Sequence, residues 1–443
     1  MSKSKSKSKR EKFSGQLGFI LSCIGAAVGL GNIWMFPYRL GQNGGAAFLI
    51  PYFLFVFILG TTGIVTETAF GRTMKSGSMS GIRRVFKDKK LKGGRIISYI
   101  PTLGLGGVFI FYTVVVGWVL KYFAISLTGE INSIDAGTYF NNFVSSKEAI
   151  LWHGIAVGLT LLIVIFGVSK GIEKINRIIM PALFAIFIIL TMRSLTLPGA
   201  GRGIAYLLYP RWEQLLVVNT WVMALGQAFF TVSLTGCALV VYGSYTDDKV
   251  DLPSAAIRTA IFDTLAALLA AFVIIPAVFA YGLDVSAGPG LLFVTVPIIF
   301  KSMPFGALLS ALFFLSVIFA SISSCIVMLE GPVEAAMSEL NVSRKNGTMV
   351  IAILCFILGI PMDMNMDLFS KFSDFITILV TPMGTLIIVI AFFYVFGGEK
   401  AVKEINIGAS KPVGKLFRVL VKYGLTVTTI VVFVLGIVYG GIG

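Results

Sequence analysis

Apolar runs long enough to cross a lipid bilayer recur along this chain almost from end to end. A hydrocarbon core about 30 Å thick needs roughly 20 apolar residues per helix. Eleven runs meet that need, at residues 15–40, 44–70, 97–126, 150–168, 175–196, 213–243, 255–282, 305–338, 347–361, 368–397 and 415–440. The sequence therefore predicts an all-α polytopic membrane protein. Residues 1–12 would form a disordered basic segment, and 13–440 a single transmembrane domain.

Composition agrees with this class. Hydrophobic residues make up 56% of the chain and charged residues 13%, which is far from the balance of a soluble globular domain. The four cysteines all fall within apolar runs and lack a CxxC spacing, so neither a disulfide framework nor a zinc site is expected. The net charge of +15 would suggest nucleic acid as a partner of a soluble protein.

The distribution of the basic residues points to a membrane instead. They cluster in the N-terminal segment and at 72–95, 169–177, 343–345 and 399–422, while the connections between these clusters hold few. By the positive-inside rule this places the N-terminus in the cytoplasm and, with eleven spans, the C-terminus outside. We expect a multi-pass protein of the cell membrane that contacts anionic lipid head groups, with no nucleic-acid partner.

The first run contains a stretch that weakens a helix at its centre, GAAVGLGNIWMFPY at residues 25–38. In lipid, unwound backbone is tolerated only where protein, water or ligand supplies its hydrogen-bond partners. Free N–H groups at a half-helix end suit a carboxylate, and free carbonyl groups suit a hard cation such as sodium. The GxxxG spacing of Gly25 and Gly29 alone would fit close helix packing equally well.

A second interruption favours the binding interpretation. The sixth run carries GQAFFTVSLTGCALVVYG at 226–243, with Gly, Ser and Thr crowded at its middle. Paired interruptions five spans apart are what an inverted repeat produces, and they are the best sequence pointer to a transport site. The repeats would cover about 15–196 and 213–397, leaving an extra helix at 415–440.

Three stretches resemble the neurotransmitter:sodium symporter family, which has the leucine-transporter fold. They are GAAVGLGNIWMFPYRLGQNGGAAFLIPY (25–52), FFTVSL followed by YGSY (229–245), and FASISSCIVMLEGPVEAAMSELNVSRK (319–345). The resemblance covers about 10–440 and implies a 5+5 inverted repeat with broken first and sixth helices. It also implies import of an amino acid together with sodium ions by alternating access.

The resemblance implies two sodium sites with oxygen ligands only, which suit a hard cation. The first would use Ala27, Asn32, Thr231 and Asp263, and the second Gly25, Val28, Ala320, Ser323 and Ser324. The substrate carboxylate would meet N–H groups of Leu30 and Gly31 and the Tyr112 hydroxyl. The amino group of the substrate would face carbonyls near Ala27, Phe230 and Thr231. The side-chain pocket would be lined by Val108, Tyr112, Phe230, Ser233, Gly236, Ser324 and Met328.

The size of the substrate is inferred from Gly236. The prototype leucine carrier of this family has an aromatic residue at the matching position, so Gly236 would leave extra room. Met328 can repack around different shapes. The sequence therefore favours a large hydrophobic or aromatic amino acid.

Two acids lie inside predicted spans, Glu67 and Asp263. Intramembrane carboxylates are costly and usually functional, although each could equally serve a buried structural hydrogen bond. Animal members of the family need chloride near the first sodium site, and either carboxylate could supply that negative charge here. Transport would then be independent of chloride.

Gating residues are only partly matched. The resemblance implies gating roles for Arg10, Phe230, Tyr245 and Asp374, but Met35 stands where the family carries the outer-gate Arg.

At the inner gate, Ser338 stands where the family carries an Asp, and Glu334 or Glu339 could replace it. Nine residues separate Gly171 from Pro181, a spacing that resembles a family motif for unwinding the fifth span.

The main alternative is a sensor of the same fold that binds substrate and sodium without turnover. An enzyme is not predicted, because no HExxH, GxSxG or nucleotide-binding loop is present and the sole histidine, His153, lies at a predicted membrane edge. We expect a monomer or a weak homodimer.

Overall fold

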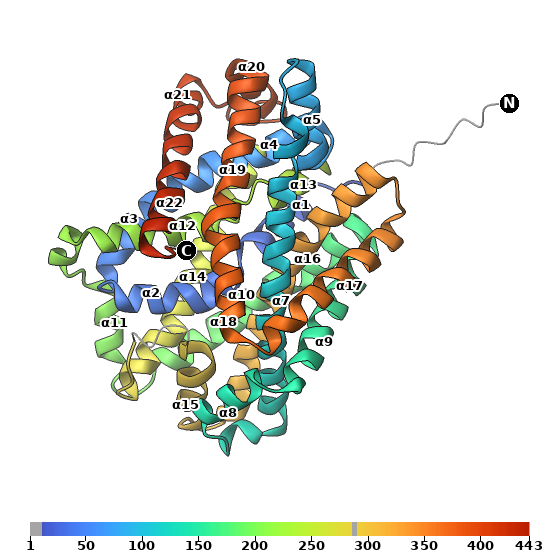
Figure 1. Ribbon diagram of the computed structural model, residues 1–443. Coiled ribbons are helices and arrows are strands. Elements are labelled where there is room, and N and C mark those ends of the chain that lie inside the picture. The colour runs from blue at the N-terminus through green and yellow to red at the C-terminus, as the bar shows by residue number, and fades with distance from the viewer. Residues whose placement is uncertain (1–10, 286–289, 443) are drawn as a thin grey trace.

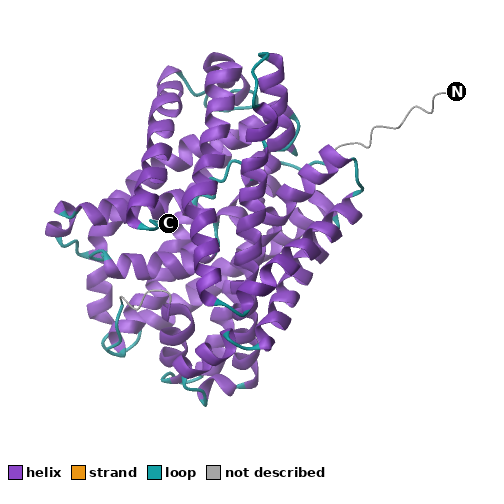
Figure 2. Cartoon of the chain, in the orientation of Figure 1, coloured by secondary structure: helices purple, strands orange, loops and turns teal. Residues whose placement is uncertain are grey.

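The computed structural model describes residues 11–285 and 290–442, and this part of the chain is helical without any strand (Figure 2). Figure 1 shows the helices crossing through one body at varied tilts. The segments written η are short 3-10 or π-helical stretches, most of them continuous with neighbouring α-helices. The elements are α1 (Gln16–Ala27), η1 (Gly31–Met35), α2 (Phe36–Gln42), α3 (Ala46–Leu59), η2 (Gly60–Ile64), α4 (Val65–Met74), α5 (Ser78–Asp88), α6 (Gly94–Ile97), α7 (Tyr99–Thr128), η3 (Glu130–Asn132), α8 (Ala136–Val144), α9 (Lys147–Val164), η4 (Val168–Glu173), α10 (Lys174–Leu195), α11 (Ala200–Leu208), η5 (Trp212–Leu216), α12 (Val218–Thr231), α13 (Ala238–Ser244), α14 (Leu252–Ala280), η6 (Leu291–Thr295), α15 (Val296–Lys301), α16 (Gly306–Leu340), α17 (Arg344–Asp363), α18 (Met366–Asp374), η7 (Phe375–Val380), α19 (Thr381–Val389), η8 (Ile390–Gly397), α20 (Gly398–Ile405), α21 (Lys415–Val419), η9 (Leu420–Leu425) and α22 (Thr426–Tyr439).

Within 11–285 and 290–442, nine helices are long and apolar enough to cross a membrane. A tenth is a pair, Gln16–Ala27 and Gly31–Gln42, bent by 52° at a short break. The predicted sixth span, 213–243, is not continuous, because it divides into α12 and α13 around residues 232–237. The predicted total of eleven depends on treating α12 and α13 as one broken span, so that number stays a prediction.

Several connections contain helices that the hydropathy pattern did not reveal. The basic segment 72–95 contains α5, the segment 127–149 contains α8, and α11 lies between the fifth and sixth predicted spans. The predicted hairpin at 283–304 includes η6 and α15, while residues 286–289 lie outside the described part. These helices are short and polar on one face, so an average over an apolar window does not detect them.

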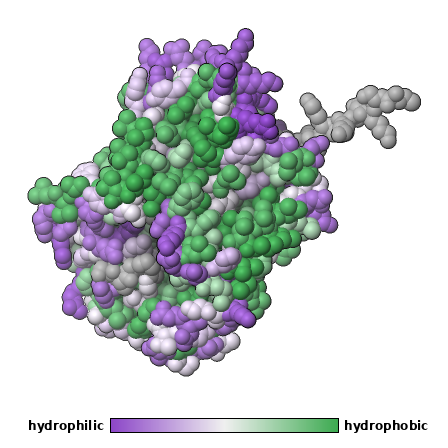
Figure 3. Space-filling view, viewed as in Figure 1, coloured by the Kyte–Doolittle hydropathy of each residue, from purple (hydrophilic) through white to green (hydrophobic). Residues whose placement is uncertain are grey.

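The surface has the apolar character that a bilayer requires. Large side chains point outward from many helices, including Phe57, Leu103, Ile178, Ile357 and Val438. Figure 3 shows a wide apolar face beneath a strongly polar end. In Figure 1 that end carries α5, α20 and α21, whereas α8 and α15 lie at the opposite end. The basic clusters at 72–95 and 399–422 therefore lie at the same end of the molecule.

The two interrupted spans meet at the centre of the fold. Helix α1 packs against α13, and η1 packs against α12 and α14. Long helices α7 and α16 pack against each other, and α16 also packs against α1. The breaks in the chain therefore face each other inside the protein, away from the lipid.

Helices α4 and α13 approach each other so closely that glycine is required on both sides. A Cβ atom on Gly71 would lie 1.8 Å from the Val240 carbonyl oxygen, and one on Gly243 would lie 2.1 Å from the Thr68 carbonyl oxygen. The obstructing atoms belong to backbone and cannot rotate away. This contact fixes α13, the second half of the interrupted sixth span, against α4.

We predict that Gly243→Ala destabilises the detergent-solubilised protein by about 1–3 kcal/mol, the usual cost of overpacking. The measurement is thermal unfolding. Gly158→Ala is the matched control, because nothing lies within 4 Å of a Cβ at that helix position. Equal melting temperatures for the two variants would contradict the close approach.

Candidate functional site

The first interruption begins where α1 ends at Ala27. Val28 has φ −70° and ψ 112°, which is extended backbone, and helical structure resumes at Gly31. The Asn32 side chain turns back across the gap, and its Oδ1 accepts the Gly29 N–H at 2.9 Å. One amide thus satisfies a backbone donor that the break would otherwise leave without a partner.

The second interruption contains two residues in the left-handed region, Ser233 at φ 55° and Gly236 at φ 71°. Such a conformation is strained for any residue except glycine. At Ser233 a compensating bond exists, because its hydroxyl donates to the Ala26 carbonyl at 2.6 Å. At Gly236 the N–H donates to Glu67 Oε1 at 2.8 Å. The breaks are therefore joined to each other, and the second also to α4.

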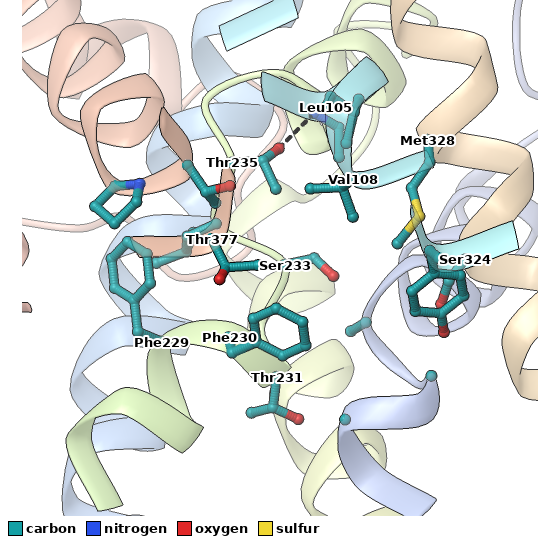
Figure 4. A pocket seen from close by; sticks show the side chains of 18 of the residues that line it. Leu105, Val108, Phe229, Phe230, Thr231, Ser233, Thr235, Ser324, Met328 and Thr377 are labelled. Atoms are coloured by element: carbon teal, nitrogen blue, oxygen red, sulfur yellow. Dashed lines mark hydrogen bonds between the residues drawn. The ribbon is translucent and has the colours of Figure 1, made fainter. Parts of the chain in front are cut away.

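A cavity opens between the two breaks. In Figure 4 the side chains of Val108, Phe230, Ser233, Ser324 and Met328 surround one space. Ala27, Leu30, Gly31, Tyr112 and Thr231 also line it. Ten of the eleven predicted substrate-binding residues therefore meet around this cavity.

The polar end of the cavity is formed by the first break. The Leu30 N–H donates to the Tyr112 hydroxyl at 2.9 Å, and the Phe230 ring packs over Gly31. The N–H groups and the hydroxyl named for a substrate carboxylate are thus neighbours. Phe230 covers them from one side.

Gly236 does not take the predicted position. It is absent from the cavity wall, and a Cβ there would lie 2.2 Å from the Gly384 carbonyl oxygen. Its positive φ and the neighbouring backbone explain the glycine, so extra pocket room at Gly236 is not supported. The sign of φ and the approach of Gly384 depend on tertiary structure, which the sequence pattern does not reveal.

The residues predicted for the first sodium site form one buried cluster. Asn32 Nδ2 lies 2.9 Å from Thr231 Oγ1 and 2.7 Å from Asp263 Oδ1, and Thr231 Oγ1 lies 2.9 Å from Asp263 Oδ2. All three side chains are buried. Ala27, the fourth predicted ligand, is the last residue of α1 and lines the same cavity as Thr231. Thr231 brings a hydroxyl and Asp263 a carboxylate, oxygen groups that suit a hard monovalent cation. Asn32 faces them with its amide nitrogen, while its Oδ1 accepts the Gly29 N–H.

The residues predicted for the second sodium site also converge. Ser324 Oγ lies 3.4 Å from the Gly25 carbonyl oxygen, 3.2 Å from that of Val28 and 3.3 Å from that of Ala320. The Ser323 hydroxyl donates to the Ala320 carbonyl at 2.8 Å. Five oxygen atoms from α1 and α16 are thus gathered beside the first break.

Sequence reasoning missed several residues at this centre. Gln227 is fully buried, and its Nε2 donates to the Gly31 carbonyl at 3.0 Å. Leu105, Thr235, Thr377 and Thr381 line the cavity as well. Thr235 lies just before α13, and its hydroxyl accepts the Ala238 N–H at 3.0 Å (Figure 4). A glutamine inside an apolar run was the one available signal for Gln227.

A cluster of charged side chains lies around the first described residues, Glu11 and Lys12. The sequence motifs did not predict this cluster. Arg344 forms two bonds to Glu330, at 2.7 and 2.9 Å, and one to Glu11 at 2.8 Å. The Tyr245 hydroxyl donates to Glu330 at 2.5 Å. Glu11 and Lys12 were expected in the disordered segment, yet Lys12 pairs with Asp247.

The predicted gate residues divide as follows. Arg10 lies outside the described residues. Ser338 donates to Glu334 at 2.8 Å, whereas Glu339 pairs with Arg83.

At the opposite end Asp374 is exposed and forms no ion pair with any described residue, while Met35 is half-buried. Gly171 lies in η4, where a Cβ would meet the Ile163 carbonyl oxygen at 2.1 Å, and Pro181 lies inside α10. The fifth span is helical across this motif in the described structure.

His153, predicted at a membrane edge, has its side chain inside the protein. It is fully buried in α9, with Nδ1 2.8 Å from Asp363 Oδ2 and Nε2 3.0 Å from Thr113 Oγ1. The ring therefore links three helices. Within the described residues no group of three or more His, Cys, Asp or Glu side chains could hold a metal ion.

Comparison with known proteins identifies the family. The sequence pattern of the sodium:neurotransmitter symporter family matches residues 10–145 and 144–440. The chain belongs to this family. Its members in the comparison are transporters, so the chain is a membrane transporter by descent and not an enzyme.

Individual relatives span nearly the whole chain. The uncharacterised sodium-dependent transporter YhdH of Bacillus subtilis is 33% identical over 86% of this chain and 87% of its own. An uncharacterised sodium-dependent transporter of Methanocaldococcus jannaschii is 31% identical over 90% of this chain and 84% of its own. The crystal structure of MhsT in complex with L-phenylalanine matches with a TM-score of 0.87 and 34% identity, covering 97% of this chain and 100% of MhsT. That likeness confirms the leucine-transporter fold.

We predict that Glu330→Gln destabilises the protein by up to about 3–5 kcal/mol, because Arg344 would lose its fully buried partner. Thermal unfolding measures the effect. Glu339→Gln is the matched control, since its ion pair with Arg83 is partly exposed and is worth about 1 kcal/mol or less. A larger loss in the control would contradict the assignment of Glu330 as the centre of this cluster.

Proposed function

We propose that the protein is a sodium-coupled symporter that imports a hydrophobic or aromatic amino acid by alternating access. One observation carries the proposal: two interrupted spans face each other around a cavity lined by N–H groups, carbonyl groups and hydroxyls, and the Asp263 carboxylate lies next to Thr231, one of the lining residues. In a membrane such irregular backbone persists only where it lines a cavity or binds a ligand. Membership of a family of sodium symporters supports the same function.

In this proposal two sodium ions bind with the substrate. The first would occupy the cluster of Asn32, Thr231 and Asp263, next to the substrate carboxylate. The second would lie between α1 and α16, where Ser324 approaches the carbonyls of Gly25 and Val28. Each ion would replace internal hydrogen bonds by stronger ion–oxygen contacts. Binding would thereby stabilise the closed arrangement of both breaks. It would also couple the sodium gradient to the uptake of the amino acid.

The character of the cavity wall supports an apolar substrate side chain. Leu105, Val108, Phe230 and Met328 are among the apolar residues that line the cavity. Aromatic and thioether groups pack well against an aromatic ring. The matched MhsT structure is a complex with L-phenylalanine, which has such a side chain. We therefore infer phenylalanine or a similar amino acid as the first substrate to test.

We propose that Asp263 makes transport independent of chloride. Its carboxylate contacts both Asn32 and Thr231, so it would supply the negative charge that compensates the first sodium ion. Glu67, the other candidate, accepts the Gly236 N–H and contacts Thr385. This arrangement gives Glu67 a role in holding the second break.

We propose that the end carrying α5, α20 and α21 faces the cytoplasm of a cell-membrane protein. Three lysines or arginines in α5 and several in 399–422 lie at that end, as the positive-inside rule requires. Glu11, Lys12 and the Arg344 cluster would then form the inner closure.

A sensor without efficient turnover is the second candidate. The specific observation in its favour is the incomplete outer gate: Met35 stands at the position where the family carries an arginine, and Asp374 forms no ion pair with any described residue. Such a protein would bind the amino acid with sodium but would not accumulate it.

The decisive experiment is uptake of radiolabelled amino acids into proteoliposomes with and without an inward sodium gradient. Accumulation above equilibrium that collapses with the gradient is expected. Sodium-dependent binding without accumulation would favour the sensor, and an absence of sodium dependence would contradict both.

Asn32→Ala should weaken sodium-dependent substrate binding by at least about tenfold, because it removes an ion ligand and the partner of the Gly29 N–H. Equilibrium binding of labelled substrate at several sodium concentrations measures it. Unchanged binding would remove Asn32 from the first site.

Asp263→Asn should make transport dependent on chloride, because the neutral amide leaves the first sodium ion without a compensating charge. Uptake is compared with chloride replaced by gluconate. Glu67→Gln serves as the control and should not create chloride dependence. If chloride has no effect on the Asp263 variant, the charge-compensation role is wrong.

A further inference from the structure

One buried amide beside the second sodium site has no assigned role. Asn176 lies in α10 and is fully buried. Its Nδ2 donates to the Ile172 carbonyl at 2.9 Å, but its Oδ1 has no hydrogen-bond partner among the described residues. A buried acceptor without a partner is unfavourable and calls for an unseen ligand, ion or water.

The orphan oxygen points at the first break. A Cβ atom placed on Gly25 would lie 2.3 Å from Asn176 Oδ1 and 3.0 Å from Ser323 Cβ. The amide oxygen therefore lies against the Gly25 backbone and beside Ser323, two of the predicted ligand residues. The same geometry explains why position 25 carries no side chain, beyond the need for close helix packing.

We propose that Asn176 Oδ1 is a further ligand of the second sodium ion, directly or through one water molecule. This inference rests on the proposed sodium symport. A sodium ion takes about six oxygen ligands in hard-cation geometry, and α1 with α16 offers five. The Asn176 oxygen would complete the set, and the ion would satisfy the orphan acceptor.

Asn176 belongs to α10, whereas the other proposed ligands come from α1 and α16, so ion binding would also affect the fifth span. Asn176 lies in the first turn of α10, which follows η4 directly, and its Nδ2 donates to the Ile172 carbonyl within η4. An ion held by the same amide would stabilise the first turn of the fifth span. Loss of the ion would release that turn. Asn176 thus couples occupancy of the second site to the helical state of residues 168–176.

The test is a sodium titration of substrate binding by the full-length protein in detergent, with labelled L-phenylalanine as the probe. Asn176→Leu keeps the volume but removes the oxygen, and should raise the half-saturating sodium concentration about tenfold. Substrate affinity at saturating sodium should stay unchanged. Ser194→Ala is the matched control, because it removes another buried oxygen without a partner from α10, far from the site.

Asn176→Asp separates a ligand from a structural amide. It keeps an oxygen at the same place but loses the donor to Ile172. As a ligand, the carboxylate should restore sodium affinity at pH 8 and lose it as the pH falls and the group protonates. A structural amide would give equal defects in the Asp and Leu variants at every pH.

Hydrogen exchange of residues 168–176 supplies a second readout. Sodium should slow exchange there in the unaltered protein, and the slowing should be lost in Asn176→Leu. An unchanged sodium titration for Asn176→Leu, or equal pH-independent defects in both variants, would overturn the proposal. If the unaltered protein binds substrate without sodium, the symport proposal itself fails, and the two failures are distinguishable.

Discussion

The need to satisfy backbone polar groups inside lipid governs this structure. Two spans are interrupted near the middle, and each interruption exposes N–H and carbonyl groups that water cannot reach. The protein meets part of this need internally, through Asn32 to Gly29, Ser233 to Ala26 and Glu67 to Gly236. The carbonyls of Gly25 and Val28 meet only long contacts from Ser324. Because these two carbonyl groups lack short hydrogen bonds, a cation that binds them would stabilise the break most.

The same constraint links binding to motion. The two breaks share hydrogen bonds, so a change in one break alters the hydrogen-bond partners of the other. An ion bound between them would therefore affect both. The charge cluster of Glu330, Arg344 and Glu11 holds the start of the first span in place. In our proposal Asn176, which lies against Gly25 and is bonded to Ile172, connects the second ion site to the fifth span. Ion binding, closure at one end and helix order in α10 thus form one physical network, which is the basis for coupling proposed here.

Sequence reasoning located the membrane class, the family and both interruptions, because these depend on local pattern and on contiguous motifs. Ten of eleven expected substrate residues meet around one cavity for the same reason. Gly236 differs because its positive φ and the backbone of Gly384 arise from tertiary packing. Gln227, Asn176 and the Glu330–Arg344 pair were missed because each is a single polar residue whose partner is distant in sequence or absent. The break in the sixth span was predicted from its Gly, Ser and Thr residues, but its bounds at 232–237 were not, because hydropathy averages across six residues.

The central claim is that the two interruptions form one site in which sodium and the amino acid stabilise each other. Linkage requires such coupling to be reciprocal. The most direct measurement is therefore a pair of titrations on the purified protein, amino acid at fixed sodium and sodium at fixed amino acid. The account predicts that sodium raises amino-acid affinity and that the amino acid raises sodium affinity by the same factor. Amino-acid affinity that does not change between sodium and potassium would contradict it.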